Sequence, residues 1–318
     1  MCDNLRLAKE LSENKLRQLT EELSTAFTDG GFDKPFLDNV CVYATGSLGR
    51  FELSPTSDLD LFFILNSEEP CSNLDMYRFF SKLYDINKKM GFKDPSKRGH
   101  YWFFILKKDL LDIGSQDEDY TNGFTARLLL LLESKPIFNE ALYNTILTET
   151  INAYFKGREK GKDFHPMRLI NDIDKYWLTV MQNQVRLMSY SDGTKYDRNW
   201  KRMKIGYPRL LTCWSIKACL FKEEITPEYV MSVVKRAPVE RLDFVAGLNA
   251  EVSQIVTDIK QGYDWFLSLT KETEQWWDEP NNEALGTKNK EEFRELVVRT
   301  LMNEMHKKNP DLRHKLDF

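Results

Sequence analysis

Strand-forming sequence is confined to the first third of the chain, and this limits most strongly the folds that the chain can adopt. Val40–Ala44 and Leu59–Leu65 are short apolar runs, and Tyr101–Leu106 is a third run rich in aromatic residues. Runs of this length and composition favour buried strands. Apolar residues recur with helical spacing at 5–28, before the first run, and at 76–90, between the second and the third. The sequence therefore predicts the order helix, strand, turn, strand, helix, strand.

From Phe124 onward the strand signals vanish. Long helical patterns follow at 124–156, 166–190, 205–222, 227–236, 239–271 and 290–307. Segment 156–163 holds two glycines and no large apolar residue, so we interpret it as a linker. The predicted fold class is α+β, with a mixed sheet flanked by helices at 1–155 and an all-α domain at 156–318.

Composition excludes several classes of protein. The chain has 318 residues, of which 13% are aromatic, which suits about two folded domains and not a disordered chain. No run approaches the roughly 18–20 consecutive apolar residues of a membrane span. Met1–Lys9 lacks the apolar block of a secretory signal, and the five cysteines are scattered without a C-x-x-C pair. We therefore expect a cytoplasmic protein with free thiols and without membrane contact.

The net charge of −4 hides an uneven distribution of charge. Residues 156–217 carry a local charge of +8, whereas the remaining chain carries −12. The densest basic stretch, 198–209, alternates with tryptophan and tyrosine. One interpretation is a helix with a solvated basic side and a buried aromatic side. The other is a surface that contacts nucleotide or RNA phosphates through Lys201, Lys204 and Arg209.

A glycine-bearing turn directly follows the first predicted strand. Gly46 and Ser47 begin this turn, and their backbone N–H groups and the serine hydroxyl can approach a phosphate closely because glycine has no side chain. Arg50 could reach the same phosphate, and Glu52 could hold Arg50 in place. Ser57 follows shortly after, and we include it among the candidate nucleotide-binding residues.

Two carboxylates stand at the entry to the second predicted strand. Asp58 and Asp60 are two residues apart, so in an extended chain both point to the same face. Two carboxylates on one face repel each other unless a cation lies between them. A hard divalent ion resolves this conflict, and Mg²⁺ is the ion most often held by one or two carboxylates together with substrate phosphates. We therefore predict one or two Mg²⁺ ions, replaceable by Mn²⁺.

Arg127 lies on an otherwise apolar predicted helix, where a buried charge requires a partner. An ion pair with Glu133 or Asp119 is the favoured interpretation.

Nucleotidyl transfer requires at least a turn that binds phosphate and a pair of carboxylates that binds metal, and the sequence predicts both side by side. Residues 43–64 resemble the active-site signature of the DNA polymerase β-like nucleotidyltransferase superfamily, in the branch close to the bacterial PII uridylyltransferases and their uncharacterised relatives. Asn122–Lys135 is similar to the helix that follows the catalytic sheet in that branch. His165–Trp177 and Lys201–Leu211 resemble its helical partner region.

The resemblance implies a small mixed sheet flanked by helices, a two-Mg²⁺ mechanism and a nucleoside triphosphate donor. It assigns triphosphate contacts to Gly46 and Ser47, and metal binding and catalysis to Asp58 and Asp60. Many members of the superfamily supply a third carboxylate from a later strand, but Tyr101–Leu106 contains no acidic residue. The nearest acidic residues that could replace it are Asp94, Asp109 and Asp112.

We therefore expect a Mg²⁺-dependent nucleotidyltransferase that transfers a nucleoside monophosphate from a triphosphate such as ATP. A protein, a tRNA end and a small molecule are all compatible as acceptors. The alternative is a catalytically silent module with the same fold that binds nucleotide or a partner without turnover. A helical scaffold whose basic stretch binds a partner is a third hypothesis.

Overall fold

Four strands form one mixed sheet in the order β3-β2-β1-β4. The computed structural model describes residues 2–55, 57–95, 99, 102–113, 122–157, 165–190, 194–222, 224–272 and 274–308. The strands are β1 (Val40–Ala44), β2 (Leu61–Leu65), β3 (Phe104–Leu106) and β4 (Lys135–Phe138). Strand β1 runs antiparallel to β2 and β4, and β2 runs parallel to β3.

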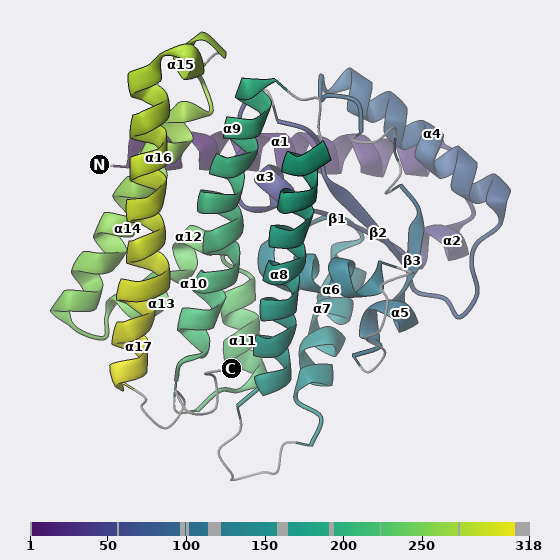
Figure 1. Ribbon diagram of the computed structural model, residues 1–318. Coiled ribbons are helices and arrows are strands. Elements are labelled where there is room, and N and C mark those ends of the chain that lie inside the picture. Colours follow the sequence, from purple (N-terminus) through teal and green to yellow (C-terminus); the bar gives the residue numbers. More distant parts are fainter. Residues whose placement is uncertain are drawn as a thin grey trace. The chain divides into compact units, whose positions relative to one another are not determined.

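The two faces of the sheet are covered by different helices (Figure 1). On one face, Val42 and Phe63 join a core with apolar residues of α1 (Asp3–Asp29) and α4 (Asn73–Lys89). On the other face, Tyr43 donates its hydroxyl hydrogen to the Ala126 carbonyl in α6 (Gly123–Glu133) at 2.9 Å. The ring of Tyr43 also contacts Tyr143 in α7 (Glu140–Tyr154), with ring centroids 6.3 Å apart. The sheet is therefore buried on both faces, as its apolar runs predict.

The prediction that strands end before Phe124 is wrong. Strand β4 pairs with β1, and it divides the predicted helix 124–156 into α6 and α7. Pro136 cannot donate a ladder hydrogen bond, and it is tolerated because β4 lies at the edge of the sheet. Only four residues long and interrupted by proline, β4 carries little of the pattern by which strands are recognised.

The remaining predicted elements of the first half are present with shifted bounds. The predicted helices 5–28 and 76–90 correspond to α1 and α4, and β3 is shorter than the predicted run 101–106. Three short helices complete this half: α2 (Lys34–Asp38), α3 (Gly46–Gly49) and α5 (Lys107–Leu111). The structure confirms the predicted α+β class, with a small mixed sheet and many helices. The described residues do not include 114–121, among which is Asp119. They also do not include 158–164, which cover most of the predicted linker.

The described residues beyond Phe138 contain helices and no strand. In order they are α7, α8 (Met167–Tyr190), α9 (Lys195–Lys204), η2 (Ile205–Arg209), α10 (Leu210–Leu220), α11 (Pro227–Val234), α12 (Pro238–Arg241), α13 (Asp243–Ala246), α14 (Ala250–Leu269), α15 (Glu274–Asp278), α16 (Pro280–Arg294), η3 (Glu295–Leu301) and α17 (Met302–Lys308). Segments η2 and η3 are π-helical and join their neighbours end to end (Figure 1). Tyr207 of η2 stacks on Phe293 and Phe266, with ring centroids at 4.4 and 4.9 Å.

The chain divides into two compact units. One comprises residues 7–156, and the other comprises 157–318 together with residues 1–6. The sequence-based division assigns the first six residues to the sheet. In the structure Asp264 binds them, because its carboxylate accepts the Leu5 N–H at 2.9 Å and the Asn4 side-chain amide at 3.0 Å. Within the described part of the chain, no helix has both the length and the apolar character needed to cross a membrane.

Candidate functional site: a glycine turn beside two carboxylates

Asp58 and Asp60 directly precede β2 and alternate with core residues. Leu59 and Leu61 are buried members of the core, whereas Asp58 and Asp60 are half-buried. The backbone N–H of Thr45 donates to the Asp60 carbonyl at 2.9 Å, so the pairing with β1 continues one residue beyond β2. Because side chains alternate along extended backbone, both carboxylates point away from the leucine core.

The Asp60 carboxylate lies directly against the turn that follows β1. Gly46 has a φ of +63°, and a β-carbon at this position would lie 2.3 Å from Asp60 Oδ2. Both the backbone conformation and the close approach therefore require glycine here. Gly49 is required by contact alone, since its β-carbon would lie 2.0 Å from the Glu133 carbonyl oxygen. The turn thus fits closely between Asp60 and the end of α6.

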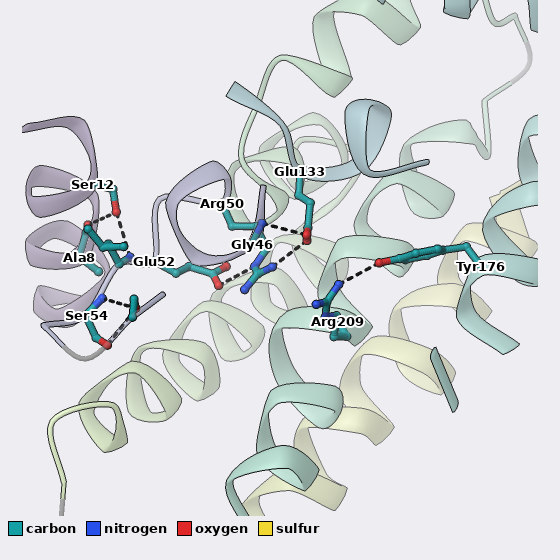
Figure 2. A network of polar contacts seen from close by, with 11 residues as sticks. Ala8, Ser12, Gly46, Arg50, Glu52, Ser54, Glu133, Tyr176 and Arg209 are labelled. Carbon is teal, nitrogen blue, oxygen red and sulfur yellow. Dashed lines mark hydrogen bonds and ion pairs between the residues drawn. The ribbon is translucent and has the colours of Figure 1, made fainter. Parts of the chain in front are cut away.

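A buried ion-pair network holds this turn (Figure 2). Arg50 Nε donates to Glu52 Oε2 at 2.7 Å, and Arg50 Nη1 donates to Glu133 Oε2 at 2.7 Å. The second oxygen of Glu133, Oε1, accepts the Gly46 N–H at 3.1 Å. The three ionic side chains are at most 7% exposed. Glu133 is the last residue of α6, where the helix dipole opposes a negative charge, so the guanidinium stabilises it.

Glu133 has a different role from the one predicted. It pairs with Arg50, whereas Arg127 donates from Nε to the Tyr154 hydroxyl at 3.0 Å and from Nη1 to the Leu110 carbonyl at 2.9 Å. The sequence pattern does not predict Glu133 as part of the site. The sequence feature that points to it is its place at the end of a run of five leucines, because a carboxylate buried there needs a partner.

The structure also places the other predicted nucleotide-binding residues of this unit. The Arg50 guanidinium and the Gly46 N–H, both expected to face phosphate, are bound to carboxylates of the chain itself. The Ser57 hydroxyl accepts the Ser54 N–H at 3.0 Å in a local turn. Ser47 is half-exposed. The roles of these residues toward nucleotide stay predictions.

Strained backbone brings Arg50 and Glu52 to their positions. Phe51 lies between them with a φ of 62°, a conformation that is rare for a bulky residue and costs about 1–3 kcal/mol. The Glu52 N–H donates to the Ser47 carbonyl at 2.7 Å, and the Leu53 N–H donates to the buried Ser12 hydroxyl at 2.9 Å (Figure 2). These bonds tie the segment to the turn and to α1, which offsets the strain.

The donor set at this site is of the kind that Mg²⁺ takes, namely two half-buried carboxylates, and Mg²⁺ usually completes such a set with substrate phosphates and water. A third acidic ligand is absent from the described residues, where no group of three or more His, Cys, Asp or Glu could hold a metal. Of the three candidates, Asp94 pairs with Lys88 at 2.6 Å and is 64% exposed. Asp109 is half-buried next to β3, and Asp112 is exposed.

The predicted basic residues of the helical unit lie on α9 and at the end of η2. Lys201 is half-buried and Lys204 is exposed, and Arg209 Nη1 donates to the Tyr176 hydroxyl at 2.8 Å (Figure 2). Two aromatic residues of the same stretch face inward: Trp200 stacks on Phe266 with ring centroids 5.8 Å apart, and Tyr207 is fully buried. These two rings are therefore engaged in the core and not presented for stacking with bases. Phosphate contacts by the basic side chains stay a prediction.

Comparison with known proteins gives no family assignment. A scan against models of protein families finds no match to this chain, and a search of curated proteins finds no significant match. The resemblance of residues 43–64 to the nucleotidyltransferase superfamily therefore stays a prediction from the sequence motif.

Proposed function

We propose that this chain is a Mg²⁺-dependent nucleotidyltransferase that transfers a nucleoside monophosphate from a nucleoside triphosphate to an acceptor. Asp58 and Asp60 would hold the metal, and the half-exposed Ser47 would face the triphosphate. A protein side chain, a tRNA end and a small hydroxyl compound are all suitable acceptors.

One observation carries this proposal, namely the contact between the Asp60 carboxylate and Gly46. The carboxylate lies beside the turn in the space that a side chain at position 46 would need, because Asp60 Oδ2 is 2.3 Å from where a β-carbon of Gly46 would be. Asp58 lies on the same side of the chain because Leu59, between them, is buried in the core. A glycine turn and two carboxylates facing the same side form a compact place for a metal-bound phosphate.

The reaction assigned to this place is a displacement at the α-phosphorus. An acceptor oxygen forms a bond to this phosphorus, the bond to the bridging oxygen of the β-phosphate breaks, and pyrophosphate leaves. The acceptor's proton passes to water. When bound, Mg²⁺ supplies charge stabilisation and lowers the pKa of the attacking hydroxyl. The two aspartates orient the reacting groups, and the buried Arg50 network keeps the turn in place.

The test is transfer of label from each α-³²P nucleoside triphosphate to acceptors in a cell lysate, together with pyrophosphate release. We expect Asp58→Asn and Asp60→Asn each to lower both by more than about a hundredfold, because each removes a charged metal ligand. The free energy of unfolding should change by less than about 0.5 kcal/mol, since neither side chain is part of the core.

Asp94→Asn is the matched control, because this aspartate lies on the surface and pairs with Lys88. It should retain wild-type transfer. Wild-type turnover in either Asp58→Asn or Asp60→Asn would show that the site is wrongly assigned.

A catalytically silent nucleotide-binding module is the second candidate. The observation that favours it is the bond from the Gly46 N–H to Glu133, which occupies a donor that a triphosphate would use. Titration calorimetry with each triphosphate and Mg²⁺ separates the two proposals. Binding without pyrophosphate release, in the presence of protein and tRNA acceptors, would favour the silent module.

A further inference from the structure

Glu133 joins two parts of the sheet unit that are far apart in the sequence, namely the end of α6 and the turn at residues 46–50. Glu133 is the last residue of α6. Its carboxylate accepts hydrogen bonds from the Gly46 N–H, 87 residues earlier, and from Arg50 Nη1, 83 residues earlier. Its carbonyl oxygen also packs against Gly49. The residue is 2% exposed, so these contacts take the place of solvent around it.

The contacts of Glu133 reach Asp60 through one residue. Gly46 is bound on its N–H side by Glu133, and its α-carbon lies against the Asp60 carboxylate. A movement of the Gly46 backbone toward Asp60 would clash, and a movement away would remove the surface on which the carboxylate rests. The orientation of Asp60 therefore depends on the bond between Gly46 and Glu133.

We propose that Glu133 is a positioning residue that holds the Asp60 carboxylate in its metal-binding orientation through Gly46. This inference rests on the proposed function only for the identity of the ion at Asp60. Glu133 itself is buried behind the turn and acts through Gly46 and Arg50.

The chemistry of the network requires a carboxylate at position 133. Each of its two oxygens accepts one donor, Oε1 from Gly46 and Oε2 from Arg50. A glutamine has the same shape but only one acceptor oxygen, and its NH₂ group donates. Glu133→Gln therefore directs an NH₂ group at another donor, either the Gly46 N–H or the Arg50 guanidinium, and displaces one of them.

The experiment measures Mn²⁺ binding by electron paramagnetic resonance, with Mn²⁺ as the probe in place of Mg²⁺. Asp60→Asn should abolish tight Mn²⁺ binding. Glu133→Gln should weaken it by about tenfold or more, the usual loss when a group that orients a metal ligand is changed. The matched control is Glu149→Gln, which removes a carboxylate from the more exposed ion pair with Lys107 in the same unit. It should leave the affinity within about twofold of wild type.

A second variant keeps the test possible if the first variant does not fold. If circular dichroism shows that Glu133→Gln is unfolded at the working temperature, Arg50→Lys replaces it. A lysine ammonium cannot reproduce the fork by which Arg50 binds Glu52 and Glu133 at separate nitrogens, so the same loss of Mn²⁺ affinity is expected.

The outcomes separate this inference from the proposed function. Weakened Mn²⁺ binding in Glu133→Gln supports the positioning role, even if no triphosphate yields pyrophosphate, a result that would count against nucleotidyl transfer alone. The positioning role is overturned if Glu133→Gln binds Mn²⁺ as Glu149→Gln does. It is also overturned if Asp60→Asn binds Mn²⁺ like wild type or if the wild-type protein binds none, whatever turnover shows.

Discussion

Gly49 has no space for a side chain. A β-carbon there would lie 2.0 Å from the Glu133 carbonyl oxygen and 2.8 Å from the Ala44 carbonyl oxygen. Both atoms belong to backbone, which cannot move aside as the end of a flexible side chain can. At this single residue, the backbones of α3, β1 and the end of α6 therefore come into close contact.

Gly49→Ala should therefore destabilise the protein by about 3 kcal/mol or more, the upper range for overpacking, because backbone must shift. Gly247→Ala is the control. Gly247 has nothing within 4 Å of its β-carbon position and has a helical φ of −76°, so alanine should be neutral or slightly stabilising. The free energy of unfolding in urea measures both. Equal stability of the two variants would contradict the close packing at Gly49.

The edge strand β4 connects α6, which ends at Glu133, to the sheet. It begins two residues after Glu133, and Lys135 pairs with Ala44 at the end of β1. At the scale of elements, β4 therefore holds the end of α6 beside the turn at Gly46. Ile137 is its only fully buried residue and belongs to the core with α1 and α4.

Ile137→Ala should lower the free energy of unfolding by about 2–4 kcal/mol, because it removes buried methyl groups and leaves a cavity. Leu74→Ala, on the 67% exposed Leu74 of α4, is the control and should change stability by less than about 0.5 kcal/mol. Urea unfolding measures the free energy of unfolding of both variants. A loss below about 1 kcal/mol for Ile137→Ala would show that β4 contributes little to the core.

Both compact units bury a free thiol deeply. Burial raises the pKa of Cys41 in the sheet unit, and that of Cys219 in the helical unit, from the ordinary value of 9.0 to about 12. At the scale of the whole molecule, the native state therefore keeps both protons at a pH where the unfolded chain loses them.

Stability should accordingly fall as the pH rises above 9. Between the unfolded and native pKa values the native state binds more protons, so the free energy of unfolding decreases, by up to about 1.4 kcal/mol per pH unit for each thiol. Urea unfolding at pH 8.0, 8.5, 9.0 and 9.5 measures this decrease at pH values below the ordinary tyrosine pKa of about 10. The double variant Cys41→Ala, Cys219→Ala should show a flatter slope, and an equal slope would contradict the assignment to these thiols.

Much of the fold follows from local sequence patterns. The spacing of apolar residues predicts α1 and α4, and the apolar runs predict β1 and β2 to within two residues. The i, i+2 spacing of Asp58 and Asp60 predicts their common side, in agreement with the burial of Leu59. The bond between Arg50 and Glu52 was also predictable, because it joins residues two positions apart.

Contacts between distant residues were decided by tertiary structure alone. The sequence shows an apolar helix that ends in a glutamate, but only the folded chain shows that Glu133 binds Arg50 and Gly46. Likewise, β4 has too short a pattern to be recognised and exists because β1 offers it an unpaired edge. Periodicity records which side of an element is buried, whereas the partner of a buried charge depends on how elements pack. The sequence by itself therefore determined most of the longer elements and the two aspartates, and the tertiary structure determined the edge strand and the contacts that hold these parts together.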